Sequence, residues 1–91
     1  MITAFVMVQA NPDSIPEVAE RMVALDGVRE VYSVTGDTDL IAVVRVKDHD
    51  DLADVIADRL SKIEGVRSTR TYLGFRAYSK EDLDAAFDIG N

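Results

Sequence analysis

The sequence predicts an α+β sandwich in which two helices cover one face of a four-stranded antiparallel sheet. The main observation is an internal repeat: Gly27-Val28-Arg29 recurs as Gly65-Val66-Arg67, and the flanking segments match as well. Within each copy, an alternating apolar run precedes a helical pattern, and another extended run follows the glycine. Two strand-helix-strand units in tandem give the βαββαβ order of the ferredoxin-like fold.

Alternation of apolar with other residues marks the first strand of each unit. The positions expected to face the helices are Ile2, Ala4, Val6 and Val8 in one unit and Leu40, Ala42, Val44 and Val46 in the other. Because side chains alternate along a strand, the intervening residues point to the opposite face. The apolar residues on that face are Phe5, Met7, Ile41 and Val43. An uncovered apolar patch marks an interaction surface, so we expect a two-fold homodimer.

Capping residues set the predicted helix boundaries. The first helix begins at Ser14, which suits the N-cap, while Glu17 stands at the capping-box position and Gly27 ends the helix. The second helix opens on the acidic run 48–51, which suits a positive helix start, and Gly65 ends it. The apolar stripes are Ile15, Val18, Ala19, Met22 and Leu25, then Leu52, Val55, Ile56, Leu60 and Ile63.

The C-terminal residues form a separate part of the prediction. Residues 1–78 form the ferredoxin-like domain, and residues 79–91 form a short helical tail that Ser79 caps. Leu83, Ala86 and Phe87 lie along one side of this tail helix. An alternative to dimerisation is that the tail folds back and covers the apolar sheet face within one chain.

Composition excludes several classes of function. The 91-residue chain has no cysteine, hence no disulfide and no thiolate metal site, and its net charge of −7 repels phosphate backbones and anionic membrane surfaces. No apolar run reaches the roughly 20 residues that span a bilayer. The N-terminus lacks the features of a secretion signal. These observations predict a cytoplasmic protein that binds neither nucleic acid nor membrane directly.

Side chains suited to catalysis or metal binding are sparse. His49 is the single histidine and lies among Asp48, Asp50 and Asp51. A charge-matched helix start explains these acids, and a structural zinc needs four ligands. The sequence shows neither a nucleophile elbow nor a glycine-rich phosphate loop. We therefore expect no catalytic residue, no metal and no cofactor.

The loop Gly36-Asp37-Thr38-Asp39 is the candidate site. It joins two apolar runs, and the equivalent place after Gly74 carries no acid. One interpretation is a turn in which Asp and Thr side chains bond the local backbone. The other is a ligand site, where Asp37 and Asp39 hold an ammonium group and N–H groups near Gly36 hold a carboxylate. The residues themselves leave both interpretations open.

Two motifs resemble a known family. The run 34–40, Val-Thr-Gly-Asp-Thr-Asp-Leu, and the Gly65-Val66 pair followed by two threonines are similar to the C-terminal effector-binding (RAM) domain of Lrp/AsnC transcription regulators. The resemblance covers roughly residues 2–76. It implies a dimer that assembles into a ring of dimers and binds amino acids or related metabolites where dimers meet. The ligand contacts that it implies are Gly36, Asp37, Asp39 and Leu40, followed by Thr69 and Thr71. We also expect Thr38, which belongs to the same loop, to contact the ligand.

The chain also differs from those regulators. They carry an N-terminal helix-turn-helix domain, whereas the predicted sheet begins at Ile2, and Thr38 stands where many relatives have a larger residue. We therefore expect a non-enzymatic, stand-alone module that senses an amino-acid-type effector and oligomerises. It would serve regulation of amino-acid metabolism, with a full-length Lrp/AsnC regulator as a candidate partner. A purely structural assembly module and a small dimeric monooxygenase are the alternatives.

Overall fold

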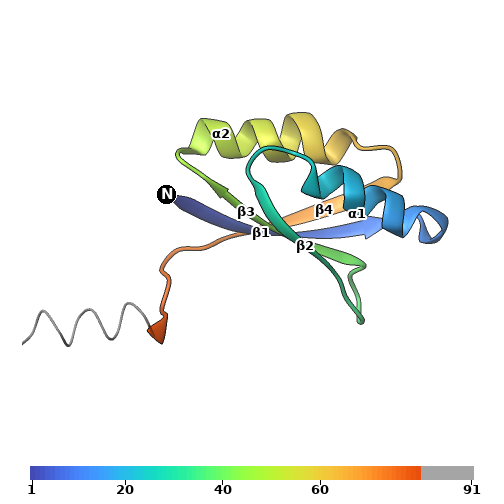
Figure 1. The fold of residues 1–91 in the computed structure, drawn as a ribbon, viewed down its shortest axis with the longest axis horizontal. Helices are drawn as coiled ribbons and strands as arrows, with labels where there is room; N and C mark the ends of the chain where they lie inside the picture. The colour runs from blue at the N-terminus through green and yellow to red at the C-terminus, as the bar shows by residue number, and fades with distance from the viewer. Residues whose placement is uncertain (81–91) are drawn as a thin grey trace, which may run out of the picture.

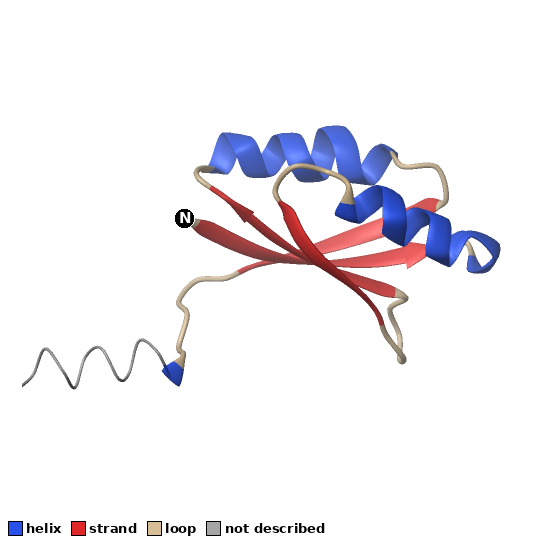
Figure 2. Cartoon of the chain, viewed as in Figure 1, coloured by secondary structure: helices blue, strands red, loops and turns tan. Residues whose placement is uncertain are grey.

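The structure is a computed structural model and describes residues 1–80. In that range, four strands form one antiparallel sheet in the order β2-β3-β1-β4, and the helices lie on one side of it (Figures 1 and 2). The strands are β1 (Ile2–Ala10), β2 (Val28–Ser33), β3 (Leu40–Val46) and β4 (Val66–Leu73). A helical segment connects β1 to β2, and another connects β3 to β4. The predicted ferredoxin-like sandwich is confirmed.

The register of the central strands decides which residues face the helices. Val6 of β1 pairs with Ala42 of β3 and with Thr71 of β4, so these residues share the helix-facing side. Phe5 and its β3 partner Val43 lie on the other side, which we call the open face. The open face also includes Met7, Gln9, Tyr32, Ile41, Ser68, Arg70 and Tyr72. The predicted alternation is therefore correct on both faces.

The core lies between the sheet and the helices. Its fully buried members come from both layers, and they include Ala4, Val6, Val8, Val18, Met22, Leu40, Ala42, Val44 and Leu60. Burying aliphatic side chains in this layer is the main favourable term for folding a chain of this size. The core leaves the open face with no covering layer in residues 1–80.

The first helix, α1 (Ile15–Val23), is entered through a short 3-10 turn, η1 (Pro12–Ser14). The predicted side-chain cap at Ser14 is wrong, because its hydroxyl makes no capping hydrogen bond. The Ser14 backbone N–H already donates to the Asn11 carbonyl at 2.9 Å, so this residue belongs to the preceding turn. Gly27 follows the helix with φ +93°, a conformation that favours glycine.

The second helical segment is continuous but changes its winding. It runs through α2 (His49–Ala53), the π-helical η2 (Asp54–Arg59) and a 3-10 turn, η3 (Leu60–Lys62). At its start, the Asp48 carboxylate accepts a hydrogen bond from the Asp51 N–H at 3.0 Å. The Leu60 N–H donates to both the Ile56 and the Val55 carbonyls, and the second bond is the five-residue step of a π-helix. This wider turn lets Val55 and Leu60 both enter the core.

The chain leaves the sheet at Gly74, whose N–H donates to the Thr3 carbonyl at 2.7 Å. Beyond Gly74 it runs toward the side of the sheet opposite the helices (Figure 1). The predicted tail helix, with Leu83, Ala86 and Phe87, lies outside the described residues. The division at residue 78 therefore stays a prediction.

Candidate ligand-binding site

The loop between β2 and β3, residues 34–39, is held against the end of β1. The Asp39 N–H donates to the Val8 carbonyl at 3.2 Å, and the Val34 N–H closes the loop on the Asp39 carbonyl at 3.1 Å. Gly36 forms the tip with φ +122°, and an added Cβ there would meet no atom within 4 Å. Backbone conformation, rather than lack of space, therefore favours glycine at this tip.

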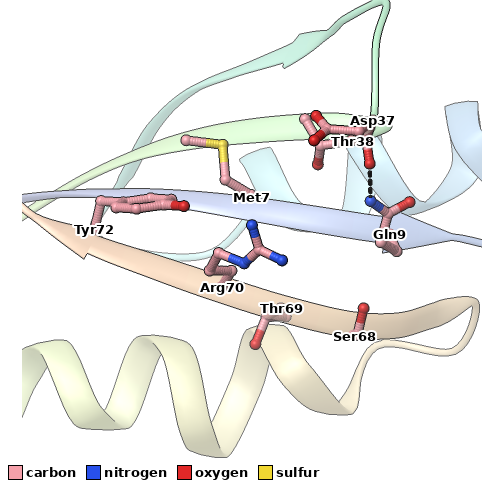
Figure 3. Close-up of a pocket in the computed structure, with 8 residues that line it drawn as sticks. All are labelled: Met7, Gln9, Asp37, Thr38, Ser68, Thr69, Arg70 and Tyr72. Atoms are coloured by element: carbon pink, nitrogen blue, oxygen red, sulfur yellow. Dashed lines mark hydrogen bonds between the residues drawn. The ribbon is translucent and has the colours of Figure 1, made fainter.

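Side chains reinforce the same attachment. The Thr38 hydroxyl donates to the Val8 carbonyl at 3.3 Å, and the Asp39 carboxylate accepts from the Ala10 N–H at 3.0 Å. The Gln9 side-chain amide donates to the backbone carbonyl of Asp37 (Figure 3). Thr38 and Asp39 thus bind β1 through their own side-chain oxygens, whereas Asp37 binds it through its backbone carbonyl. This arrangement leaves the Asp37 carboxylate out of the loop's attachment.

The open face is hollowed beside this loop into a pocket of about 600 Å³ (Figure 3). Strands β1 and β4 both line this pocket, because Met7 pairs with Arg70 and Gln9 pairs with Ser68. The Arg70 side chain extends from β4 over β1, and its guanidinium lies between Tyr72 and Gln9 (Figure 3). The residues that line the pocket are Met7, Gln9, Asp37, Thr38, Ser68, Thr69, Arg70 and Tyr72.

Charges of opposite sign stand on two sides of this pocket. Arg70 comes from β4, and Asp37 comes from the loop above β1 (Figure 3). The neighbouring Tyr72 phenol raises the pKa of the Arg70 guanidinium, and the Asp37 carboxylate adds a smaller effect in the same direction. Met7 and the Tyr72 ring supply apolar surface between polar groups. The pocket therefore offers a cation, an anion and an apolar wall to one small molecule.

The structure brings together part of the set predicted from the sequence. Asp37, Thr38 and Thr69 line the pocket, although Thr69 pairs with the helix-facing Val8 and its side chain points toward the helices (Figure 3). Leu40 is fully buried in the core, because it begins β3 on the helix-facing side. The remaining predicted contacts, which do not line the pocket, are Gly36, Asp39 and Thr71.

Sequence reasoning missed the contribution of β1 and, apart from Thr69, that of β4. Three of the missed residues, Ser68, Arg70 and Tyr72, follow each other at every second position of β4. That alternation is visible in the sequence, and it separates them from Thr69 and Thr71. The alternation alone does not show that these residues line a pocket. That follows only from the pairing of β4 with β1, which places Arg70 beside Met7 and Ser68 beside Gln9.

Comparison with known proteins identifies the family. Residues 3–83 match the model of the Lrp/AsnC ligand binding domain. The chain belongs to this family. A regulator from Pyrococcus horikoshii, the uncharacterized HTH-type transcriptional regulator PH1916, is 35% identical over 82 residues, which are 87% of this chain and 55% of that protein. The chain thus spans about half the length of the curated Lrp/AsnC relatives that it matches.

Solved Lrp/AsnC structures share the fold. The crystal structure of TTHA0845 from Thermus thermophilus superposes with a TM-score of 0.83 at 46% identity, covering 87% of this chain and 99% of that one. The feast or famine regulatory protein from M. tuberculosis, complexed with L-methionine, gives a TM-score of 0.70 at 25% identity. That match covers 87% of this chain and 53% of the mycobacterial chain.

Membership of the Lrp/AsnC family makes the chain a regulatory ligand-binding domain rather than an enzyme. In residues 1–80, the space between helices and sheet, where a dimeric monooxygenase would hold its substrate, is filled by the apolar core. Over the same residues, no three His, Cys, Asp or Glu side chains are grouped to hold a metal ion. No helix there is long and apolar enough to cross a bilayer.

Proposed function

We propose that the open-face pocket binds an amino-acid-type effector and that the chain acts as a sensing module of an Lrp/AsnC regulatory system. One observation carries this proposal: Arg70 and Asp37 place opposite charges in a single pocket of about 600 Å³. A free amino acid carries the same two charges on neighbouring atoms. Ligand pockets of about 300–1,000 Å³ with a few placed polar groups are typical of small-molecule sites.

The pocket suggests how such a ligand is oriented. The Arg70 guanidinium suits the α-carboxylate, because its planar donors match a carboxylate in pairs. The Asp37 carboxylate suits the ammonium group, and Met7 with the Tyr72 ring receives an apolar side chain. The L-methionine bound to the mycobacterial relative supports a ligand of this class.

Self-association completes the proposed mechanism. The pocket lies on the open face, whose apolar residues are partly exposed, so a second copy that approaches this face also closes the pocket. A ligand that contacts both copies stabilises the assembly, and the assembly in turn raises the affinity for the ligand. In this scheme the signal reaches DNA through mixed assemblies with a full-length Lrp/AsnC regulator of amino-acid metabolism.

A thermal-shift screen against the proteinogenic amino acids, combined with light scattering, tests the proposal. We expect one or a few amino acids to raise the melting temperature and change the oligomer size. At a ligand concentration of about 100 times Kd, binding adds about 2.7 kcal/mol to the free energy of unfolding. Absence of any shift across the screen would reject the effector role.

Charge-neutralising variants locate the site. Asp37→Asn and Arg70→Gln each remove one of the two charges and should abolish the response to the selected amino acid. Arg67→Gln is the matched control, because Arg67 is exposed on the same strand and does not line the pocket. A response that survives in both pocket variants would place the ligand elsewhere.

A purely structural assembly module is the second candidate. It is favoured by the hydrogen bonds that Thr38 and Asp39 make to β1, because these explain two of the loop's polar side chains without a ligand. Under this alternative, the protein oligomerises with no response to amino acids. The amino-acid screen distinguishes the sensing module from the structural module.

A further inference from the structure

The segment that follows β4, residues 74–78, extends away from the domain, and we call it the arm. Gly74 begins it, fixed to β1 by its hydrogen bond to the Thr3 carbonyl. An added Cβ on Gly74 would lie 3.0 Å from that carbonyl oxygen, so glycine permits the close approach. The arm therefore leaves the sheet from a defined point at the end of β4.

The arm carries two aromatic side chains that its own domain does not cover. Phe75 is 96% exposed and Tyr78 is 83% exposed. Leaving an aromatic ring in water forgoes the favourable burial of about 150–250 Å² of surface. Two such rings on a five-residue segment indicate that the arm has a partner surface.

The direction of the arm selects that surface. It leaves the sheet on the side opposite the helices, which is the side of the open face (Figure 1). A molecule seated on the open face would meet the arm at its edge.

The open face offers matching chemistry. Three of its aromatic side chains, Phe5, Tyr32 and Tyr72, remain 39–50% exposed. Ile41 and Val43 lie between them on β3 and pack against no covering layer in the described part of the chain. Aromatic rings pack well on one another and on branched aliphatic side chains, so this face suits Phe75 and Tyr78.

We propose that the arm of each chain packs on the open face of a second copy, with Phe75 and Tyr78 seated beside Phe5 and Tyr72. A two-fold arrangement satisfies both arms and both faces at once, because each copy supplies the same arm and the same face. The exchange fixes the two copies in one relative position and encloses the neighbouring pocket. The inference rests on the self-association in the proposed function and identifies the segment responsible for it.

Sedimentation analysis of the full chain tests the arm. The double variant Phe75→Ser/Tyr78→Ser should raise the dimer dissociation constant about tenfold or more. Both positions are exposed, so the domain should fold as before. Val23→Ser, at a half-exposed position on α1, is the matched control and should leave the constant unchanged. An unchanged constant in the double variant would overturn the proposal, whereas the amino-acid response tests the proposed function separately.

A spin label identifies which face receives the arm. The chain has no cysteine, so Ala77→Cys accepts a single nitroxide between the two aromatic residues. Labelled chains are mixed with unlabelled chains that carry ¹³C-methyl isoleucine. We expect broadening of the Ile41 methyl signal on the open face, while Ile15 and Ile56, which belong to the helices on the other side of the sheet, stay sharp. Sharp Ile41 signals in the mixture, with broadening only within a labelled chain, would show that the arm covers its own face and would overturn the exchange.

Discussion

The carboxylate of Asp39 accepts a hydrogen bond from the backbone N–H of Ala10 across a distance of 3.0 Å. β3 begins at Leu40, opposite Val8, and β1 continues for two residues beyond that pair. At this point a carboxylate takes the place of the missing strand partner. An acid directly before a buried strand is therefore explained by the unequal lengths of two neighbouring strands.

Asp39→Ala should lower the free energy of unfolding by about 1–3 kcal/mol, because the N–H of the buried Ala10 loses its partner. Asp39→Asn keeps an acceptor oxygen and should cost less. Asp37→Ala is the control, since Asp37 bonds Gln9 through its backbone carbonyl. Urea unfolding of the three variants measures the difference. Equal stability of Asp39→Ala and the parent chain would contradict the structural role.

The sequence was sufficient to predict the fold because its signals are long and repeated. Alternation over seven or more positions in β1 and β3 determines which face is buried, and the repeat fixes the element order. Local capping was less predictable. The Ser14 hydroxyl has the right chemistry for an N-cap, but the preceding 3-10 turn leaves it without a capping bond.

The candidate site could be predicted only in part, for a related reason. The loop is contiguous in sequence, so Asp37 and Thr38 stand out by composition alone. Arg70 and Gln9 are 61 positions apart and reach one pocket only because β4 pairs with β1. Leu40 belonged to the loop motif, yet strand alternation places its side chain in the core. Motif membership does not by itself decide which way a side chain points.

Two glycines with positive φ should differ in their tolerance of alanine. At Gly65, φ is +100° and an added Cβ would lie 2.7 Å from Val18 Cγ2, whereas at Gly36 φ is +122° and no atom lies within 4 Å. Gly36→Ala should therefore cost only the left-handed backbone penalty of about 1–2 kcal/mol. Gly65→Ala should cost more, because the Val18 side chain must also move.

Thermal unfolding of the two glycine variants makes this comparison. In a domain of this size, each kcal/mol lost lowers the melting temperature by about 4–8 °C. Gly65→Ala should melt several degrees below Gly36→Ala. A lower melting temperature for Gly36→Ala than for Gly65→Ala would contradict this prediction. It would mean that the Val18 side chain moves aside without loss of stability and that the tip at Gly36 makes contacts in the assembly.

The π-helical winding of the second helix predicts an energetic role for Leu60. This residue is fully buried, and its N–H completes the five-residue step to the Val55 carbonyl. Leu60→Ala should lower the free energy of unfolding by about 2–5 kcal/mol through lost burial and a residual cavity. The exposed neighbour Ser61 provides the control Ser61→Ala, which should change stability by less than about 0.5 kcal/mol. Chemical denaturation measures both, and a small loss for Leu60→Ala would show that the wide turn can close over the cavity.

The hydroxyl of Tyr32 donates a hydrogen bond to the Glu30 carboxylate at the edge of the open face. This hydrogen bond, together with the negative charge of Glu30, raises the pKa of the Tyr32 phenol above its ordinary value of 10.0. The folded chain therefore holds the phenolic proton at a pH where the unfolded chain releases it. The resulting stabilisation is complete below pH 10 and is lost as the pH rises through the raised pKa.

Ultraviolet titration of the phenolate tests this pair in the variant Tyr72→Phe/Tyr78→Phe, which leaves Tyr32 as the only tyrosine. We expect a midpoint above that of the urea-unfolded chain. Adding Glu30→Gln should move the midpoint back toward the unfolded value, because the carboxylate charge is gone while the side chain keeps its size. A titration midpoint that Glu30→Gln leaves unchanged would show that the Tyr32 and Glu30 side chains do not interact in solution.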